Sequence, residues 1–427
     1  MAAVRLRAPP EPLPAGHESL LEACAANWSG AAGFDLSLYE TAAEAMDAYA
    51  AFHASSLRSS ETRQSLVFVP NQYGLGNRLR AMKSTLLLAM LTGRVFHVRW
   101  EDPFPLAALV RPERIDWREP QDAPLTRAVA AQFKPRMPTA AHILCLPFAT
   151  APPNGDCARS HRDLQTADLR ATYANVESLE VHTFTDLYIF LSKNPHYEAL
   201  LARLEPSCPK RMGCLYKFLF SPQPIVERRL GALIAAAADA ADWDATSSGA
   251  AGAMPGSAFI GVQVRNRLWK LDALKGGVAS PGRMMSCLDR WVPPRVPVFF
   301  TADDDALYAP ARQHWGARLL TDEGGKVYEP WSRGGKVDAA TLGEDAEQSV
   351  IKAFVDWFAL QSASRIVYTH QSSFGKTAAE STTAPNVDVN YTRCVLVEAG
   401  RRSWQSLWEE QSGSSMTYDT SKVPGAR

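Results

Sequence analysis

The sequence has no hydrophobic run long enough to cross a membrane. Across its 427 residues the longest apolar segments are "LLLAML", from Leu86 to Leu91, and "ALIAAAA", from Ala232 to Ala238. A transmembrane helix needs roughly 20 predominantly apolar residues, so we expect no membrane span. The N-terminal segment "MAAVRLRAPPEPLPAG" also lacks the apolar core of a signal peptide, and the sequence therefore leaves the compartment open.

An excess of charge of one sign is also missing. The chain has 45 lysines and arginines against 45 aspartates and glutamates, and its isoelectric point is about 7.1. Proteins that bind duplex nucleic acid or an anionic membrane surface usually carry a clear basic excess. We therefore expect no nucleic acid as a partner, and binding of any anionic ligand would depend on a local group of basic residues.

The seven cysteines form no CxxC pair and no cluster with histidines. Without such spacing a structural zinc site is not expected. Cys208 and Cys214 bracket the short segment "PKRMG". The sequence leaves open whether these two cysteines form a disulfide or remain free thiols.

The length of the chain predicts more than one folded core, because single cores rarely grow beyond about 250 to 300 residues. We expect a helical N-terminal extension over residues 1–60, a first Rossmann-like domain over 61–241, a linker over 242–257 and a second Rossmann-like domain over 258–427. The linker is the tract "DWDATSSGAAGAMPGS", whose Ala, Gly and Ser content is typical of a flexible connection.

A strand-helix-strand unit opens the first domain. Leu66 to Val69 has the pattern of a buried strand, Asn77 to Leu91 that of a helix, and Val95 to Trp100 that of a second strand. This order predicts a parallel sheet with a right-handed crossover. Weaker signals predict strands at His142 to Leu146 and Leu179 to Phe184, and a helix at Ile225 to Ala241.

The same alternation restarts after the linker. Strands are expected at residues 258–265, 296–302, 317–321 and 365–370. Helices are expected near 282–291, from Asp304, over 347–362 and from Lys376. Such an order is typical of a doubly wound α/β domain with helices on both faces of a parallel sheet.

The turn "GLGNR" joins the first strand to its helix. Gly74 and Gly76 allow the backbone to approach a ligand closely, and the following helix presents its first amides to an anion such as a diphosphate. The turn is not a dinucleotide fingerprint, because Leu79 stands where GxGxxG requires its third glycine. A plain tight turn with Asn77 as the N-cap of the helix is the alternative interpretation.

Two segments of the second domain have the features of an anion site. Arg265 ends the first strand at the carboxyl edge, where open α/β sheets bind ligands, although a surface salt bridge is the alternative. In "RIVYTHQSSFGKT", Ser372, Ser373 and the amide of Gly375 lie at the start of a helix. This segment is not a Walker loop, because His370 occupies the position of the first glycine.

Three aspartates of the second domain have two interpretations each. Asp303 and Asp305 form a DxD pair, a pattern that can hold Mg²⁺ or Mn²⁺ at nucleotide phosphates. The alternative, which we favour, is that they cap the helix beginning near Asp304. Asp356 follows Lys352 by four positions within a helix, and an i,i+4 ion pair is its simplest explanation.

Taken together, four segments resemble a known family. They are "GLGNRLRAMKSTLLLAMLTGRVFHVRW", "FLFSPQPIVERRL", "IGVQVR" and "VDWFALQSASRIVYTHQSSFGKTAAE", and they span Ser65 to Glu380 with gaps. In this order they are similar to the GDP-fucose-dependent fucosyltransferases, most closely to the plant xyloglucan type. The resemblance implies a GT-B-like fold with two Rossmann-type domains facing across a cleft, and the C-terminal domain holds the donor. It also implies inverting transfer of L-fucose from GDP-fucose to a glycan or glycoprotein hydroxyl, without a metal or other cofactor.

The resemblance also assigns roles to single residues. Arg265 matches the family arginine on the donor phosphates, and Asn77 and Arg78 match first-domain residues that close over the donor. Asp356 matches an aspartate that reads guanine, whose adjacent N–H donors one carboxylate can accept as a pair. The Ser-Ser-Phe turn around the phosphates corresponds to Ser372, Ser373 and Phe374. With Gly74, Gly76 and Gly375 these residues form the expected donor site.

The chain departs from the family pattern at two points. Family members usually carry a membrane anchor for the Golgi, and none is readable here. Some relatives place a general base eight positions after the phosphate arginine, where Ala273 stands. Asp272, Glu101 and Asp102 are possible substitutes, with Asp272 placed in the expected catalytic set.

Two other functions stay open at the level of the sequence. One is a metal-dependent glycosyltransferase that uses another sugar nucleotide through the DxD pair. The other is a non-catalytic protein that binds nucleotides or glycans on the same scaffold. The acceptor and its linkage are not readable from the sequence.

Overall fold

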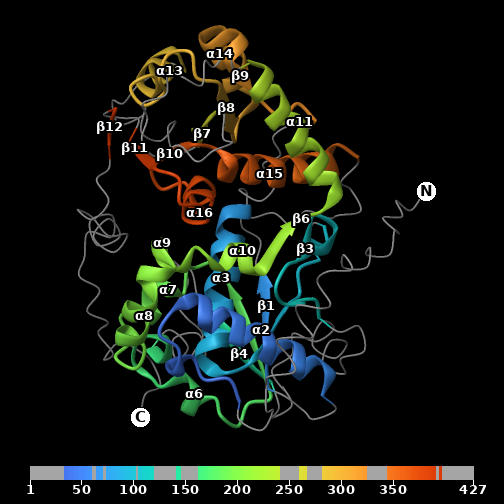
Figure 1. Ribbon diagram of the computed structural model, residues 1–427, viewed down its shortest axis with the longest axis vertical. Helices are drawn as coiled ribbons and strands as arrows, with labels where there is room; N and C mark the ends of the chain where they lie inside the picture. Colours follow the sequence, from blue (N-terminus) through green and yellow to red (C-terminus); the bar gives the residue numbers. More distant parts are fainter. Residues whose placement is uncertain are drawn as a thin grey trace, which may run out of the picture.

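The structure of the protein, a computed structural model, contains a parallel and a mostly parallel β-sheet stacked along the long axis of the molecule (Figure 1). It describes residues 33–59, 64–70, 74–101, 104–119, 141–145, 162–240, 259–266, 281–324, 344–390 and 394–396. The predicted linker 242–257 lies outside the described residues.

A four-stranded parallel sheet with strand order β2-β1-β5-β4 forms the lower half of the molecule in Figure 1. Its strands are β1 (Ser65–Pro70), β2 (Val95–Val98), β4 (Ala141–Cys145) and β5 (Ser178–Thr183). The predicted strand-helix-strand unit is confirmed, because α3 (Leu75–Thr92) connects the parallel strands β1 and β2. The alternative N-cap is wrong, since Gly74 and not Asn77 caps α3.

Helix α3 is buried along almost its whole length, which explains its run of leucines. It lies between the first sheet on one side and the helices α10 (Leu215–Leu219) and α16 (Ser373–Glu380) on the other. The helix ends at Gly93, whose φ of 65° is the left-handed conformation that glycine adopts without strain.

Smaller elements surround the first sheet. The predicted helical lead-in is confirmed as α2 (Ala42–Arg58), which begins with a capping box between Thr41 and Glu44. A separate antiparallel pair joins β3 (Val110–Pro112) to β6 (Phe220–Pro222). The other helical segments are η1 (Leu36–Leu38), η2 (Leu106–Ala108), α6 (Leu169–Thr172), α7 (Tyr188–Leu191), α8 (Glu198–Leu204) and η3 (Glu205–Ser207), whereas α9 (Pro209–Met212) is a turn with left-handed backbone angles.

A six-stranded sheet with strand order β12-β11-β10-β7-β8-β9 forms the upper half of the molecule. All its strand pairs are parallel except β11 with β12. Its strands are β7 (Ile260–Val264), β8 (Val298–Ala302), β9 (Leu319–Leu320), β10 (Arg365–Thr369), β11 (Asn386–Asn390) and β12 (Val395–Leu396). The predicted parallel order of this domain is therefore confirmed.

Alternate side chains along these strands face two layers of helices, as the pleat of a strand requires. Val262 and Val298 share a buried cluster with residues of α13 (Pro281–Leu288) and α14 (Tyr308–Trp315). On the other face, Phe299 and Ile366 pack with residues of α15 (Glu344–Ser362). The sheet is thus covered on both faces, which is the doubly wound arrangement.

One predicted helix start in this domain is wrong, and one predicted helix is divided in two. Helix α16 begins at Ser373 rather than at Lys376, because Ser372 already caps it. The helix expected from Asp304 is divided into η4 (Asp305–Leu307) and α14, which begins at Tyr308. After α14 the short segment η5 (Gly316–Arg318) leads into β9.

Helix α11 (Pro224–Ala240) ends the range that the sequence assigns to the first domain, but it packs on α15 of the second sheet. The guanidinium of Arg229 on α11 forms an ion pair with Asp322, which follows β9. The chain therefore crosses to the second sheet before the predicted linker begins.

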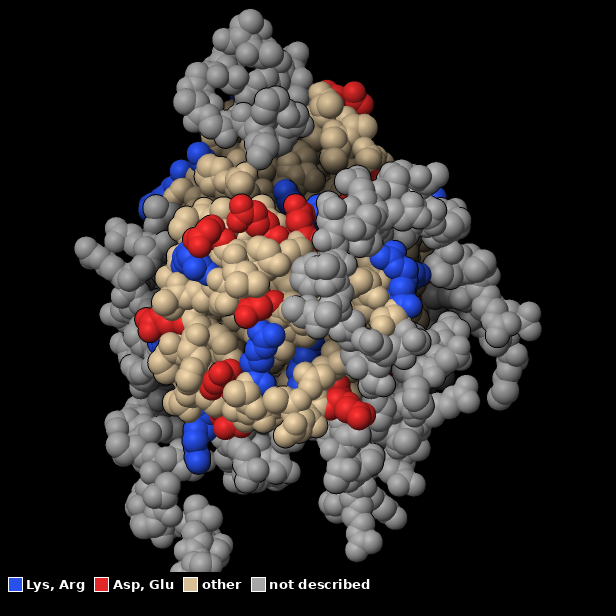
Figure 2. Space-filling model, turned by 60° about the horizontal axis from the view of Figure 1, so that its bottom comes forward, with Lys and Arg blue, Asp and Glu red and all other residues tan. Residues whose placement is uncertain are grey.

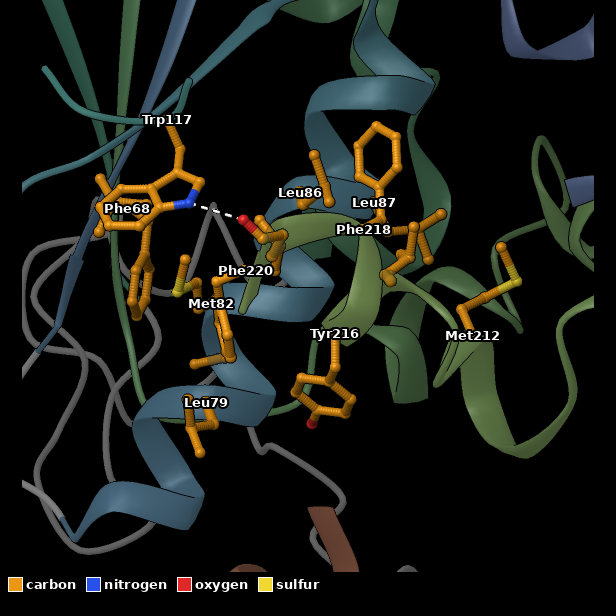
Figure 3. Close-up of a cluster of buried hydrophobic side chains, with 14 of the residues drawn as sticks. Phe68, Leu79, Met82, Leu86, Leu87, Trp117, Met212, Tyr216, Phe218 and Phe220 are labelled. Carbon is orange, nitrogen blue, oxygen red and sulfur yellow. Dashed lines mark hydrogen bonds between the residues drawn. The ribbon is translucent and has the colours of Figure 1, made fainter. Parts of the chain in front are cut away.

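The two halves share one hydrophobic core on the side of α10 and α15. The indole of Trp357 on α15 lies 5.6 Å from the ring of Tyr216 and 5.8 Å from that of Phe220. Figure 3 shows Tyr216 and Phe220 beside the leucines of α3, and the indole of Trp117 donates a hydrogen bond of 2.7 Å to the carbonyl oxygen of Leu219. The relative position of the two sheets is therefore set by packing.

Two disulfide bonds are present in the described part of the chain. Cys208 pairs with Cys214, six positions away, which answers a question that the sequence left open. Cys287 on α13 pairs with Cys394 beside β12, at a sequence separation of 107. Disulfides of this kind are typical of proteins that fold in an oxidising compartment.

Acidic and basic side chains are interspersed over the molecular face in Figure 2, as the balanced composition leads one to expect. Among the helices of the described ranges, none combines the length and the apolar character needed to span a bilayer.

Candidate functional site

The N-termini of α3 and α16 meet at Gly76. A Cβ atom on Gly76 would overlap the amide nitrogen of Phe374 and lie 2.5 Å from both the Cα of Phe374 and the carbonyl carbon of Ser373. Helix α3 follows the carboxyl end of β1, and α16 follows the carboxyl end of β10. The carboxyl edges of the two sheets therefore face each other at this contact, although they are about 300 residues apart in the sequence.

The first turn of α16 is built for close backbone approach. The buried Ser372 is its N-cap, and the Oγ atom of Ser372 accepts a hydrogen bond of 3.4 Å from the amide of Gly375. A Cβ on Gly375 would lie 2.5 Å from the Cβ of Tyr368 and 2.7 Å from Oε1 of Gln263. Gln371 has a φ of 66°, so the turn before the helix is in the left-handed region. The first amides of a helix have no acceptor within it, which makes this turn a suitable anion site.

Arg265 lies beside this turn at the end of β7. Its amide donates a hydrogen bond of 2.7 Å to Oγ1 of Thr369, the last residue of β10. Its side chain is 29% exposed, and Nε lies 3.9 Å from Oδ2 of Asp303. The structure therefore brings Arg265 and the start of α16 to one edge of the second sheet, where a guanidinium and helix amides can act on the same anion.

In the acidic segment after β8, the side-chain carboxylates accept hydrogen bonds from backbone amides. Asp304 is the N-cap of η4 and accepts a hydrogen bond of 3.0 Å from the amide of Ala306. Asp303 accepts one of 2.5 Å from the amide of Asn266. The helix is capped by an aspartate of this segment, but the interpretation of Asp303 and Asp305 as the caps is wrong, because Asp304 is the cap and Asp305 is the first residue of η4. In the ranges that the structure describes, no group of three or more His, Cys, Asp or Glu side chains is placed to hold a metal ion.

Asp356 is buried on α15, and both its oxygens are engaged. Nζ of Lys352 lies 3.2 Å from Oδ1, and Oγ1 of Thr301 donates a hydrogen bond of 2.8 Å to Oδ2. Burial acts to lower the pKa of Lys352, but the Asp356 carboxylate raises it above the ordinary value, so the lysine is charged at neutral pH. The predicted i,i+4 pair is present. Guanine recognition stays a prediction, and it would require Asp356 to exchange one of these partners for the base.

Asn77 and Arg78 lie in the first turn of α3 and differ in environment. Asn77 is partly buried, next to the Gly76 contact. Arg78 is 1% exposed, and its guanidinium carbon lies 5.2 Å from the ring centre of Trp100. A cation over an indole ring is a favourable structural arrangement in its own right. The role of Arg78 at the donor stays a prediction, and the structure shows its side chain buried inside the first half of the molecule.

Of the sequence candidates for a general base, the structure describes only Glu101. Asp272, Ala273 and Asp102 lie outside the described residues. Glu101 is exposed at the end of the segment after β2. Although the residue is exposed as a whole, partial desolvation of its carboxyl by the surrounding protein, with a smaller contribution from Glu119, raises the pKa of Glu101.

The structure also places a histidine at the site that the sequence did not single out for a role. Nδ1 of His370 lies 3.0 Å and 3.1 Å from the two carboxylate oxygens of Asp388 on β11. His370 directly follows β10, and Arg265 directly follows β7. Two positions before them, Tyr368 and Gln263 are paired in register on these neighbouring parallel strands. His370 therefore lies across from Arg265. The sequence signal for this residue was a histidine at the carboxyl end of a predicted parallel strand. Its aspartate partner could not be predicted, because Asp388 lies on another strand.

The sequence matches no protein-family model and no curated protein sequence. Among solved structures, the chain is similar to a variant of Arabidopsis thaliana FUT1 in complex with GDP, with 15% sequence identity and a TM-score of 0.53 over 88% of this chain and 77% of that chain. It also aligns with NodZ α-1,6-fucosyltransferase co-crystallised with GDP, with 16% identity and a TM-score of 0.42 over 79% and 98% of the two chains. For NodZ from Bradyrhizobium the identity is 12% and the TM-score 0.41, over 77% and 96%.

The likeness to FUT1 shows the fold. Two parallel sheets with opposed carboxyl edges form a GT-B-like α/β architecture, as the sequence predicted.

Proposed function

We propose that the protein is an inverting glycosyltransferase that transfers L-fucose from GDP-fucose to a hydroxyl group of a glycan or glycoprotein. The observation that carries the proposal is the contact of Gly76 with the first turn of α16, next to Arg265. Two opposed sheet edges, a helix N-terminus and an arginine are the elements that bind a nucleotide diphosphate in open α/β proteins. The similar FUT1 structure is a complex with GDP.

In this proposal the first turn of α16 and Arg265 hold the two phosphates of the donor. Ser372 fixes the turn, and Gly375 keeps it free of side chains at its closest approach to the sheet. Phosphate groups favour the positive end of a helix, and a guanidinium can donate two parallel hydrogen bonds to phosphate oxygens. Ser373 and Phe374 contribute the backbone that lies against Gly76.

The same groups would also assist the reaction. Bond breaking between fucose and GDP increases the negative charge on the diphosphate, and preorganised donors stabilise that charge most strongly in the transition state. In this proposal Arg265 and the α16 amides take this role, and Asn77 and Arg78 act from the α3 side of the Gly76 contact. The acceptor hydroxyl loses its proton as it attacks, and we assign Asp272 as the base.

Asp356 is assigned to the guanine base. Guanine presents two adjacent N–H donors that a carboxylate accepts as a pair, whereas uracil has no such edge. The buried position of Asp356 strengthens a hydrogen bond once it forms, because the local dielectric is low. Binding of guanine would replace the hydrogen bond from Thr301 or the contact with Lys352.

Calorimetric titration of the protein with GDP, GDP-fucose and UDP, each with and without a chelator, tests this function. We expect GDP and GDP-fucose to bind more tightly than UDP, with the same affinity in EDTA. We also expect GDP to be released from GDP-fucose, slowly with water and faster with an acceptor. Tighter binding of UDP with loss of activity in EDTA would favour a metal-dependent enzyme. Donor binding without any turnover or hydrolysis would identify a binding protein.

The two disulfides bear on the compartment in which the protein folds. Cys208–Cys214 and Cys287–Cys394 would not persist in a reducing cytosol, where thiols are kept free. We propose that the protein folds in the secretory pathway, in agreement with the Golgi location that the family resemblance implies.

A further inference from the structure

The loop from Cys208 to Cys214 connects the first half of the molecule to the far end of α16. Nζ of Lys210 donates three hydrogen bonds to backbone carbonyl oxygens there: 3.0 Å to Ala379, 2.5 Å to Thr382 and 3.0 Å to Ala384. These carbonyls belong to the last turn of α16 and the segment that follows it. A cation at the C-terminus of a helix satisfies its unpaired carbonyls and complements the negative end of its dipole.

The backbone of this loop has an unusual conformation. Lys210, Arg211 and Met212 all have left-handed φ angles, of 58°, 59° and 59°. This region is unfavourable for residues with a Cβ atom, and it persists only where the surrounding structure imposes it. The Cys208–Cys214 disulfide closes the loop around these three residues. The disulfide and the strained turn together direct the Lys210 side chain toward α16.

Gly213 brings the backbone of the loop into direct contact with α16. A Cβ atom on Gly213 would overlap the carbonyl oxygen of Glu380 and lie 2.6 Å from the carbonyl carbon of that residue. The loop therefore contacts the last residue of the helix with no space for a side chain.

A buried ion pair connects the same helix end to α3. Nζ of Lys83 lies 3.2 Å from Oε2 of Glu380, and their side chains are 1% and 8% exposed. Nζ of Lys83 also donates a hydrogen bond of 2.9 Å to the carbonyl oxygen of Arg211 in the loop. The loop, α3 and the end of α16 thus form one polar network.

We propose that the loop from Cys208 to Cys214, which we call the strap, positions α16 through Lys210 and so fixes the α16 N-terminus against Gly76. The inference rests on the proposed function, because that N-terminus is the proposed diphosphate site. Helix α16 has eight residues and is about 12 Å long, which makes it a short rigid rod. The first half of the molecule holds this rod at both ends, at Phe374 by Gly76 and at Glu380 by the strap. A shift at one end is therefore transmitted to the other.

Lys210 is in this view a positioning residue, and its removal tests the inference. Lys210→Met keeps most of the side-chain volume and removes all three hydrogen bonds. The matched control is Lys217→Met, at an exposed lysine of the neighbouring α10. We expect Lys210→Met to raise the Kd for GDP by about 5- to 150-fold, the usual range for coupled sites, and Lys217→Met to leave it unchanged. If Lys210→Met does not fold, Lys210→Gln replaces it; its amide retains up to two donors on a shorter side chain, so we expect a smaller rise of the Kd for GDP, and an unchanged Kd would count against the inference.

A double-mutant cycle distinguishes positioning from a general loss of stability. Ser372→Ala weakens the N-terminal turn of α16 directly. If the strap acts through α16, the combined Lys210→Met and Ser372→Ala variant loses less GDP affinity than the product of the two single effects. Independent, fully multiplicative effects would overturn the inference, and so would a Lys210→Met variant with the GDP affinity of the wild type.

Hydrogen–deuterium exchange gives a readout that does not depend on GDP. We expect Lys210→Met, and not Lys217→Met, to increase exchange of the amides at residues 373–376, at the opposite end of the helix from the lost contacts. Failure of the wild type to bind GDP would refute the proposed function, and the strap would then be judged by this exchange alone. Unchanged exchange at residues 373–376 would overturn it.

Discussion

A single methyl group at Gly76 tests whether α3 and α16 meet as the structure describes. Gly76 is the second residue of α3, and Ala at such a position normally stabilises a helix by about 0.5 to 1 kcal/mol relative to Gly. Here the added Cβ would overlap the Phe374 amide nitrogen and lie 2.5 Å from two further backbone atoms. Backbone atoms at a helix start cannot move aside as a side chain can.

The expected effect follows from these two opposing contributions. Overpacking costs about 1 to 3 kcal/mol, which exceeds the gain in helix propensity. We therefore expect Gly76→Ala to lower the free energy of unfolding by about 1 to 2 kcal/mol. The melting temperature should fall by about 1 °C for each kcal/mol, because the entropy of unfolding of a chain of this length is about 0.9 kcal/mol/K. Because the methyl separates α16 from α3 at the proposed donor site, GDP affinity should fall as well.

Gly231 provides the matched control. It also lies inside a helix, α11, and a Cβ atom there would meet nothing within 4 Å. Gly231→Ala should therefore raise the free energy of unfolding by about 0.5 to 1 kcal/mol and leave GDP binding unchanged. The two substitutions are chemically identical, so their opposite signs isolate the contact with Phe374. Calorimetric unfolding and GDP titration of both variants provide the comparison. A Gly76→Ala variant as stable as Gly231→Ala, with normal GDP affinity, would refute the reasoning.

Three further changes have defined outcomes. Arg265→Ala removes a charge-assisted hydrogen bond to phosphate worth roughly 1.5 to 3 kcal/mol, so calorimetry should show GDP affinity reduced by about 10- to 150-fold in a folded protein. An unchanged affinity would show that Arg265 does not belong to the donor site. Asp356→Asn leaves the buried Lys352 without its paired carboxylate and should destabilise the protein by about 3 to 5 kcal/mol in denaturant unfolding. Adding Lys352→Met to this variant should restore the stability but not the affinity for GDP, and recovery of both would exclude guanine recognition by Asp356. Burial lowers the pKa of His53 from 6.5 to about 4, so between these pH values the unfolded state binds a proton that the folded state does not. The free energy of unfolding should therefore keep its full value above about pH 6.5 and decrease by about 3 kcal/mol toward about pH 4. His53→Gln, which can still donate to the carbonyl oxygen of Phe96, should abolish that part of the acid sensitivity, and an unchanged pH profile would contradict the assignment.

The sequence predicted the features that depend on local patterns. The apolar run from Leu66 to Val69 and the buried helix after it specified the first strand-helix-strand unit, because periodicity and burial are both readable locally. The pair Lys352–Asp356 was also predictable, since helical spacing alone brings i and i+4 together.

Features that depend on distant residues could not be predicted in the same way. Cys287 and Cys394 are 107 positions apart, and only the arrangement of α13 beside β12 brings them together. The contacts of Lys210 with α16 require a left-handed turn in a segment that contains no glycine at those positions. The start of α16 was placed three residues late, because the cap depends on the side chain of Ser372 and not on hydrophobic periodicity.

The central claim is that a nucleoside diphosphate binds where the two sheet edges meet. Hydrogen–deuterium exchange of the wild-type protein with and without saturating GDP tests it most directly. The account predicts slower exchange at both residues 74–78 of α3 and residues 372–376 of α16 when GDP is present. Protection of neither segment, with GDP bound and other regions protected, would contradict it.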